Sequence, residues 1–255
     1  MKKYLSLALA LLLCLSLCAC GGSKTEEKPA PAEETVSTEE AVVEEAPAAD
    51  PVPVNVFVTV CDAGVLRVAN EPLTVMDADG DGALNVDAAI AAAHDAFFEG
   101  GAKEGFAFEQ SEYGMSITKL WGVKNGGSYG YYVNDGYVLP DYKLTEGDCL
   151  CVYSYADLTG WSDCYAFFDQ RSAEINAGEE LELTLSMLVY DEEWVLQTEK
   201  AEGAKLIVNG ELTDLVTDAE GHVTLKLETA GDYTVTAIGP EGTTLVPPVC
   251  LVNVK

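Results

Sequence analysis

Basic residues are scarce in this chain. Lysine and arginine together number 14 against 43 aspartates and glutamates, which gives a net charge of −29 at neutral pH. Binding to nucleic acid depends on basic patches that neutralise phosphates, so this charge argues against a nucleic-acid partner. It also argues against binding to anionic lipid by charge alone.

Residues suited to catalysis are equally few. The chain has two histidines, His94 and His222, and neither stands beside a serine or cysteine motif for nucleophilic catalysis. It has no phosphate-binding loop. Acidic residues are so common that any pair of them carries little information about glycosidase chemistry. We therefore expect no enzyme activity.

Long apolar runs are absent except for one near the start. Leu5 to Leu17 is mostly aliphatic and follows Lys2 and Lys3. A membrane-spanning helix needs roughly 20 apolar residues, so this run is too short to be read first as a span. A basic start followed by a short apolar run is typical of a signal peptide, which we assign to residues 1–19.

The apolar run ends in a segment that resembles the bacterial lipobox, Leu17-Cys18-Ala19-Cys20-Gly21. Small Ala19 precedes Cys20, whereas bulky Leu17 precedes Cys18, so Cys20 is the predicted lipidation site. Each buried CH₂ contributes about 0.8 kcal/mol, and more than one acyl chain anchors stably. The resemblance implies a lipoprotein of the cell membrane that faces the extracellular side, or the periplasm in a two-membrane envelope. An ordinary signal peptide with incidental cysteines is the alternative.

Residues 20–52 differ in composition from the rest. They are rich in glutamate, alanine and proline and contain no aromatic residue. Such a segment cannot bury enough apolar surface to offset its ordering entropy, and like charges extend it. We predict a disordered acidic linker between the lipid and the folded part.

Residues 53–160 combine strand patterns with one helix pattern. Val54 to Val60 and Val65 to Val75 predict a hairpin around a turn at residues 62–64. The spacing of Val86, Ile90, Ala93 and Phe97 predicts a helix over 86–98, with Asn85 as its N-cap. Three more strands are expected at residues 116–121, 129–133 and 149–155. This order of elements fits a β-grasp-like domain.

Residues 163–255 contain strand patterns alone. Apolar residues alternate with polar ones from Leu181, from Val223 and from Tyr233, and turn sequences such as Asn209-Gly210 separate them. Regular short strands with such turns predict a β-sandwich. The expected fold class is therefore α+β, with a β-grasp-like domain followed by an all-β immunoglobulin-like sandwich.

Two segments of the chain resemble known families. The run from Leu120 to Asp135, with Tyr142 to Asp148 and the strand after it, resembles the C-terminal β-domain of transcobalamin over about residues 53–158. This resemblance implies a ligand surface around Trp121, Tyr129, Tyr131 and Tyr132, and a corrinoid as one possible ligand. The run from Thr217 to Leu227, followed by Ala230 to Ala237, is similar to bacterial immunoglobulin-like surface modules, which usually serve as spacers or adhesion units.

The acidic segment before the predicted helix has the spacing of a calcium loop. Calcium takes six to eight oxygen ligands, and alternating aspartates with a glycine at the sharp turn provide them. The departure from the usual pattern is at its last position, where Ala88 replaces an acid. An acidic turn without an ion is the alternative. The predicted ligands are Asp77, Asp79, Asp81, the carbonyl of Ala83, Asn85 and Asp87.

The aromatic segment and the cysteines each leave two interpretations open. Tyr129 and Tyr131 share one face of a strand and Tyr132 lies on the other, so one face belongs to the core and the other either packs or stacks on a flat ligand or sugar. Cys149 and Cys151 also share a face, and a neighbouring first strand would bring Cys61 close to one of them. Export permits a disulfide there, and small buried thiols are the alternative.

These patterns lead to two hypotheses of function. The first is a lipid-anchored, non-catalytic surface protein that binds or displays a small ligand through the transcobalamin-like segment. The second is a structural or adhesive surface protein with a macromolecular partner.

Overall fold

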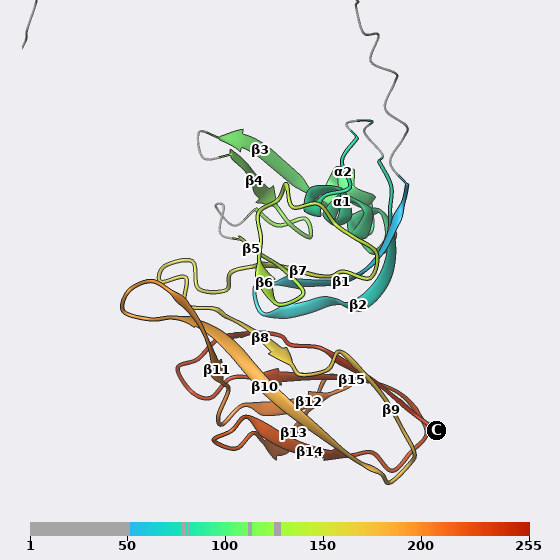
Figure 1. Cartoon of the computed structure of the whole chain (residues 1–255), viewed down its shortest axis with the longest axis vertical. Helices are drawn as coiled ribbons and strands as arrows, with labels where there is room; N and C mark the ends of the chain where they lie inside the picture. The colour runs from blue at the N-terminus through green and yellow to red at the C-terminus, as the bar shows by residue number, and fades with distance from the viewer. Residues whose placement is uncertain (1–51, 78–79, 81, 112–113, 125–128) are drawn as a thin grey trace, which may run out of the picture. The chain divides into compact units, whose positions relative to one another are not determined.

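The N-terminal half of the folded chain is built on one mixed sheet. The computed structural model describes residues 52–77, 80, 82–111, 114–124 and 129–255, so the predicted signal peptide, lipidation site and nearly all of the linker lie outside it. The sheet has the order β2-β1-β7-β5-β6 (Figure 1). Its strands are β1 (Val54–Asp62), β2 (Val65–Val75), β5 (Tyr129–Val133), β6 (Gly136–Tyr137) and β7 (Cys149–Ser154).

Turn chemistry sets the pairing of β1 with β2. Asp62 pairs with Val65 across a two-residue turn in which Ala63 and Gly64 both have positive φ, 46° and 79°. Turns of this kind match the twist of the flanking strands. β1 also lies parallel to β7, from Phe57 beside Cys149 to Asp62 beside Ser154. The predicted hairpin and the predicted neighbourhood of the first and last strands are both confirmed.

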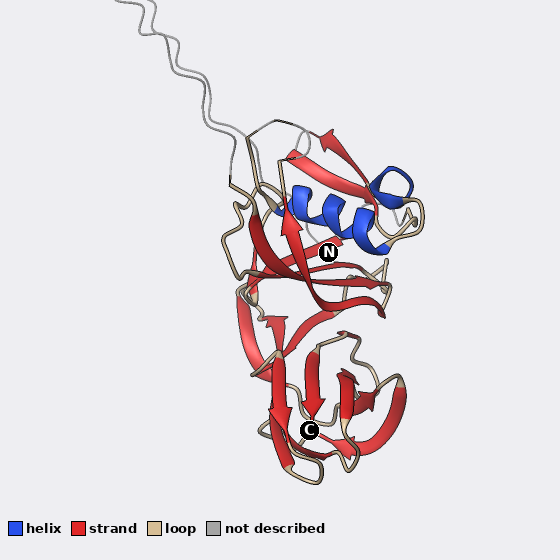
Figure 2. Ribbon diagram, turned by 90° about the vertical axis from the view of Figure 1, so that its right-hand side faces the viewer, coloured by secondary structure: helices blue, strands red, loops and turns tan. Residues whose placement is uncertain are grey.

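One helix covers a face of this sheet (Figure 2). Helix α1 (Val86–Phe97) begins after Asn85, whose side chain accepts a hydrogen bond from the amide of Ala88 at 2.9 Å. The predicted cap is confirmed, since this bond satisfies an amide that has no partner within the helix. The amides of Val86 and Asp87 donate instead to the carbonyls of Tyr142 and Pro140.

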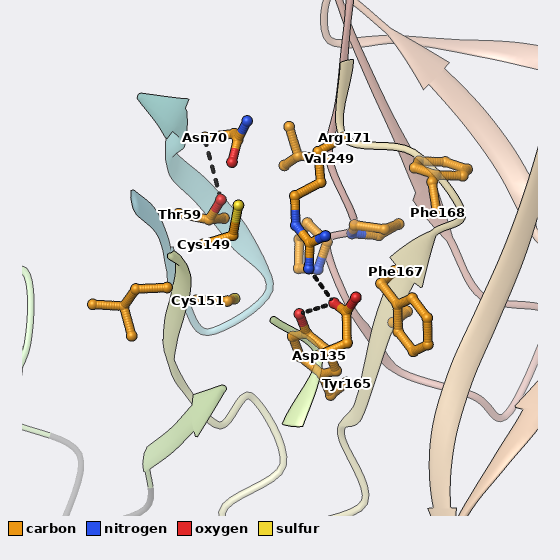
Figure 3. A pocket seen from close by; sticks show the side chains of 14 residues that line it. Thr59, Asn70, Asp135, Cys149, Cys151, Tyr165, Phe167, Phe168, Arg171 and Val249 are labelled. Atoms are coloured by element: carbon orange, nitrogen blue, oxygen red, sulfur yellow. Dashed lines mark hydrogen bonds and ion pairs between the residues drawn. The ribbon is translucent and has the colours of Figure 1, made fainter. Parts of the chain in front are cut away.

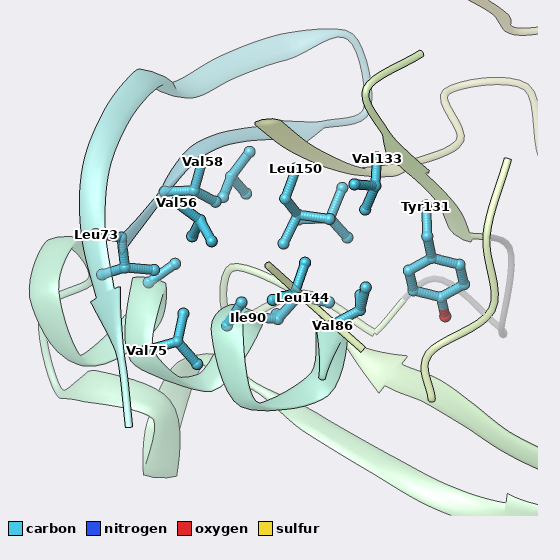
Figure 4. Close-up of a cluster of buried hydrophobic side chains, with 14 of the residues drawn as sticks. Val56, Val58, Leu73, Val75, Val86, Ile90, Tyr131, Val133, Leu144 and Leu150 are labelled. Carbon is cyan, nitrogen blue, oxygen red and sulfur yellow. The ribbon is translucent and has the colours of Figure 1, made fainter. Parts of the chain in front are cut away.

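The core lies between α1 and the sheet, as Figure 4 shows. Val86, Ile90 and Ala93 are fully buried, as their spacing predicted, but Phe97 is 39% exposed. Apolar side chains from β1, β5 and β7 meet the helix there, among them Val56, Val58, Val133, Leu150 and Val152. The short helix α2 (Gly101–Gly105) and the hairpin of β3 (Ala107–Ser111) and β4 (Gly114–Lys119) follow α1 in the chain.

The C-terminal half is a sandwich of two sheets. One has the order β11-β10-β8-β16, with β14 also paired to β10, and the other has the order β13-β12-β15-β17-β9. Their strands are β8 (Cys164–Phe168), β9 (Ser172–Ile175), β10 (Glu180–Tyr190), β11 (Leu196–Lys200), β12 (Lys205–Val208), β13 (Glu211–Val216), β14 (His222–Lys226), β15 (Gly231–Ile238), β16 (Leu245–Val246) and β17 (Cys250–Val254).

The alternating residues predicted for this half point into the sandwich. Leu183, Leu185, Leu225 and Val235 are at most 2% exposed and belong to one buried cluster. The predicted turn at Asn209 and Gly210 closes the β12–β13 hairpin, again with two positive φ angles. The immunoglobulin-like sandwich expected from the sequence is therefore present.

The expected α+β fold class, a β-grasp-like domain plus a sandwich, is wrong. Strands make up 52% of the structure and helices 9%, so the chain is mostly β. Only α1 and α2, of 12 and 5 residues, are helical within the described ranges. The prediction of a mixed class rested on one clear helical period in the sequence. Short strands such as β3, β6, β9 and β16 have weaker sequence patterns, so the strand content was underestimated. No helix of the described part is long and apolar enough to span a membrane.

Candidate functional site

Two stacked tyrosines join the halves of the folded unit. Tyr132 of β5 and Tyr165 of β8 lie with ring centroids 3.9 Å apart and planes at 5°. Both are buried, at 5% and 6% exposure, in a cluster that includes Cys61, Cys151 and Tyr153. The face of the sheet opposite α1 is thus covered by the C-terminal half, and the described residues of both halves belong to one compact unit.

A charged contact lies beside this stack. Val133 pairs with Gly136 across a two-residue turn in which Asn134 and Asp135 have φ of 50° and 66°. Asp135 accepts a hydrogen bond from the Arg171 guanidinium at 2.6 Å and another from the Tyr165 hydroxyl at 2.9 Å. Burial lowers the pKa of Arg171, but the combined effect of Asp135, Tyr165 and Cys149 holds this pKa above its usual value.

The same turn is fixed from its other side. The side-chain amide of Asn134 donates through Nδ2 to the Asp148 carboxylate at 2.8 Å. Its Oδ1 accepts from the backbone amide of Cys149 at 3.0 Å. Asp148 also accepts from the amide of Thr145 at 2.8 Å, which closes the turn before β7. Asn134 and the segment Glu146-Gly147-Asp148 are therefore joined by hydrogen bonds, and together they hold the turn that carries Asp135.

A small cavity opens between the two halves, as Figure 3 shows. Its volume is about 30 Å³, and Thr59, Asn70, Cys149, Cys151 and Arg171 are among its lining residues. A single water needs about 10–15 Å³ measured in this way. The cavity therefore suits one or two waters and is far too small for a corrinoid or a sugar.

The four aromatic residues predicted to bind a ligand are divided between two buried clusters, with Tyr132 in one and the other three at the other. Tyr131 points to the α1 side, where it is 7% exposed and its hydroxyl accepts from the amide of Ile117 at 3.5 Å. Tyr129 packs partly buried against the same core, and Tyr132 lies on the opposite face against Tyr165. These positions agree with the packing interpretation that the sequence left open for this strand.

Trp121 packs against the same core beside His94, with ring centroids 5.2 Å apart. The histidine is fully buried, and its Nε2 accepts from the amide of Trp121 at 3.0 Å. Its Nδ1 lies 2.7 Å from the carbonyl of Ile90, so the neutral tautomer with a proton on Nδ1 satisfies both contacts. Burial lowers the pKa of His94. Nδ1 is thereby engaged within α1, and Nε2 holds α1 to the Trp121 turn.

The predicted calcium loop is described only in part. Asp79 and Asp81 lie outside the described residues. The Asp77 carboxylate accepts from the amides of Gly80 at 2.9 Å and Gly82 at 3.0 Å, and Asn85 caps α1. Among the residues that the structure describes, no group of three His, Cys, Asp or Glu side chains is placed to hold a metal ion.

Asp87, the last predicted calcium ligand, lies in the first turn of α1, where its amide donates to the carbonyl of Pro140. Its Oδ1 atom is buried without a hydrogen-bond partner. Burial raises the pKa of Asp87 to about 6, and the nearby Asp141 carboxylate adds to this rise. The charged form of this residue is therefore disfavoured in the folded protein.

The cysteines of the folded part are all free thiols. Cys61 and Cys151 lie on the adjacent strands β1 and β7, with Thr59 opposite Cys151 and Cys61 opposite Tyr153. The pKa of Cys61 is raised by a hydrogen bond with Cys151 and by burial. The predicted approach of Cys61 to this strand is confirmed, and Cys61, Cys151 and Cys250 are buried whereas Cys149 and Cys164 are partly exposed.

The exposed aromatic residues lie elsewhere, and sequence reasoning missed them. Trp194 is 81% exposed and Tyr190 57%, at the tip of the β10–β11 hairpin, with ring centroids 6.2 Å apart. Tyr137 on β6 is 53% exposed, and Trp161 in the segment between the halves is 63% exposed. A tryptophan within the polar turn Asp191-Glu192-Glu193 was the available signal, because a hairpin turn cannot bury it.

Comparisons with known proteins add little to this description. No family model matches the chain, and no curated protein matches it. Among solved structures, the tandem Ig repeats of Dlar are 13% identical over 59% of this chain and 75% of theirs, with a TM-score of 0.24. The N-terminal Ig1-2 module of the Drosophila receptor protein tyrosine phosphatase DLAR is 14% identical over 59% and 74%, with a TM-score of 0.25. Both scores are too low to support an argument about this chain.

The raised pKa of Asp87 predicts a pH dependence of stability. Between about pH 4 and pH 6 the folded protein binds more protons at this residue than the unfolded chain, so its contribution falls as pH rises through that window. Asp87→Asn should therefore gain free energy of unfolding relative to the wild type between pH 4 and pH 7. Urea unfolding at a series of pH values measures this gain. A difference between the two proteins that stays constant over this range would contradict it, and Asp95→Asn on the same helix is the control.

Proposed function

We propose that this protein is a lipid-anchored, non-catalytic surface protein that binds a macromolecular partner. The observation that carries this proposal is the set of large aromatic side chains, Tyr137, Trp161, Tyr190 and Trp194, left at least half exposed on a rigid β scaffold. Tryptophan and tyrosine are enriched among the residues that contribute most to the affinity of protein interfaces.

The scaffold supports this role because it fixes the two halves. A contact surface gains affinity when its parts are held in place before binding, since less ordering entropy is then lost. The stack of Tyr132 on Tyr165 and the pair of Asp135 with Arg171 provide this rigidity. The exposed aromatic residues lie on loops and edge strands of both halves, where binding residues usually lie.

A small flat ligand such as a corrinoid is a weaker proposal. Tyr131 and Tyr132 are buried, and the cavity between the halves holds little more than one water. Trp121 and Tyr129 remain partly accessible and are the residues through which such a ligand would have to bind.

The membrane location rests on the sequence of residues 1–20. Cys20→Ser should release the protein from the membrane fraction, because its lipid would be lost, whereas Cys18→Ser should leave it anchored. Cell fractionation followed by immunoblotting measures this. The lipobox assignment fails if Cys18→Ser releases the protein and Cys20→Ser does not.

Calcium in the acidic loop is a further proposal. The amides of Gly80 and Gly82 both donate to the Asp77 carboxylate. This geometry supports an ion held by Asp77 and the neighbouring aspartates. Millimolar calcium should then raise the melting temperature, and the paired change Asp79→Asn with Asp81→Asn should abolish the rise. Magnesium at the same concentration is the control. An unchanged melting temperature with calcium would remove the ion from the account.

The binding proposal is tested on an immobilised panel of surface proteins, glycans and corrinoids. We expect the full-length protein in detergent to bind a macromolecule in the panel, and to bind corrinoids no more than a detergent blank does. Binding to corrinoids alone, lost on Trp121→Ala, would replace this proposal with the small-ligand one. The fully buried His94, which offers no free ring nitrogen, gives no reason to expect turnover of any bound compound.

A further inference from the structure

We propose that the β10–β11 hairpin binds an extended, basic polypeptide segment. The segment would lie along the outer edge of β11, with a lysine or arginine side chain over Trp194 and others beside the surrounding carboxylates. This inference rests on the proposed function, because it names the chemistry of the macromolecular partner.

The tip of the hairpin holds its aromatic residues in place. The Asp191 amide donates to the Val195 carbonyl, and the Trp194 amide to the Asp191 carbonyl, both at 3.0 Å. The Asp191 carboxylate accepts from the amides of Glu193 and Val195 at 2.9 and 2.8 Å and from Gln197 at 2.9 Å. Five hydrogen bonds therefore fix a turn of a few exposed residues, and Trp194 projects from it.

Trp194 itself adopts an unusual backbone conformation. Its φ of 61° lies in the left-handed region, which costs a residue other than glycine about 1–2 kcal/mol. A turn without a function for this side chain would be more stable with glycine or asparagine there. The strain and the 81% exposure together indicate that the indole ring is presented to a partner.

The charge around the tip selects a basic partner. Residues 190–200 carry Asp191, Glu192, Glu193 and Glu199 against the single cation Lys200. The Lys200 amine is directed to Ser186 Oγ at 3.4 Å, away from these acids. Glu192, Glu193 and Glu199 are exposed and form no ion pair in the described part of the chain. A cation over an exposed tryptophan contributes about 0.5–1 kcal/mol, and neighbouring carboxylates add to the attraction.

The edge of β11 selects an extended partner. This strand pairs with β10, from Leu196 opposite Tyr190 to Lys200 opposite Ser186, and stands at the end of the strand order. The outer edge of such a strand offers main-chain donors and acceptors to an added strand. Four of its five residues are exposed and polar, so side chains do not block this edge.

Two other occupants of this edge are disfavoured by charge. A second copy of the chain would bring together two molecules of net charge −29, each with the same acidic hairpin. The chain's own residues 20–52 are rich in glutamate and would be repelled in the same way. A basic segment from another protein is the occupant that charge complementarity favours.

The test uses the full-length protein in detergent and three synthetic decapeptides. These are alternating Lys-Val, alternating Glu-Val, and the Lys-Val peptide with N-methyl groups on alternate amides. We expect calorimetry to detect binding of the first alone, with an affinity that falls as salt increases. Equal binding of the Glu-Val peptide would overturn the basic partner, and equal binding of the N-methylated peptide would overturn the added strand.

Matched variants locate the site. Trp194→Ala should weaken the Lys-Val peptide about 2- to 5-fold, a factor that corresponds to the worth of one exposed cation–aromatic contact. Glu192→Gln with Glu193→Gln should weaken it and flatten its salt dependence. Leu212→Ala and Glu220→Gln alter exposed residues outside the hairpin and outside the set of exposed aromatic residues, and should change nothing. Equal losses in these controls would overturn the assignment.

The same variants separate this inference from the proposed function. If the protein binds a macromolecule of the panel and Trp194→Ala leaves that binding intact, the function stands and the hairpin is not its site. If the protein binds neither the panel nor the peptides, both proposals fall.

Discussion

The contact of Asp135 with Arg171 and Tyr165 is the constraint on which the arrangement of the folded unit depends. A carboxylate at the tip of a tight hairpin is brought against the other half, where it is partly buried and needs partners. Arg171 supplies the charge and Tyr165 a hydroxyl, and Tyr165 also stacks on Tyr132. Removing one partner would leave a charge without compensation in this contact, so the two halves are bound to a single geometry and the exposed aromatic residues keep fixed positions.

Much of the local structure follows from the sequence by simple rules. The two-residue period of Leu181, Leu183 and Leu185 predicted a buried face, and these side chains are buried. The helix began where Asn85 predicted, because an asparagine side chain satisfies an unpaired amide. Turns at residues 63–64 and 209–210 formed as expected, since Gly64, Asn209 and Gly210 tolerate positive φ. Each of these features depends on neighbours within a few positions of the chain.

Features that depend on distant residues were not predictable in this way. Nothing near Tyr132 in the sequence shows that Tyr165 covers it, so the aromatic face was open to a ligand interpretation. The roles of Asp135 and His94 likewise depend on partners 36 and 27 residues away. The fold class was misjudged because one regular helix outweighed several short strands whose patterns are brief. The exposed Trp194 gives the opposite lesson, since a large apolar residue inside an acidic turn was visible in the sequence and indicated a surface contact.

The central claim, that the Asp135 contact locks the two halves together, is tested most directly by a double-mutant cycle in urea unfolding. Asp135→Asn retains a residue that accepts the left-handed turn and removes the charge, and Arg171→Met removes the other partner while preserving its apolar stem. The account predicts a coupling free energy of about 0.5–3 kcal/mol. Each substitution should lower the free energy of unfolding more in the wild type than in the protein that already carries the other substitution. Losses that add to within about 0.5 kcal/mol would show that the two residues do not act together and would contradict the claim.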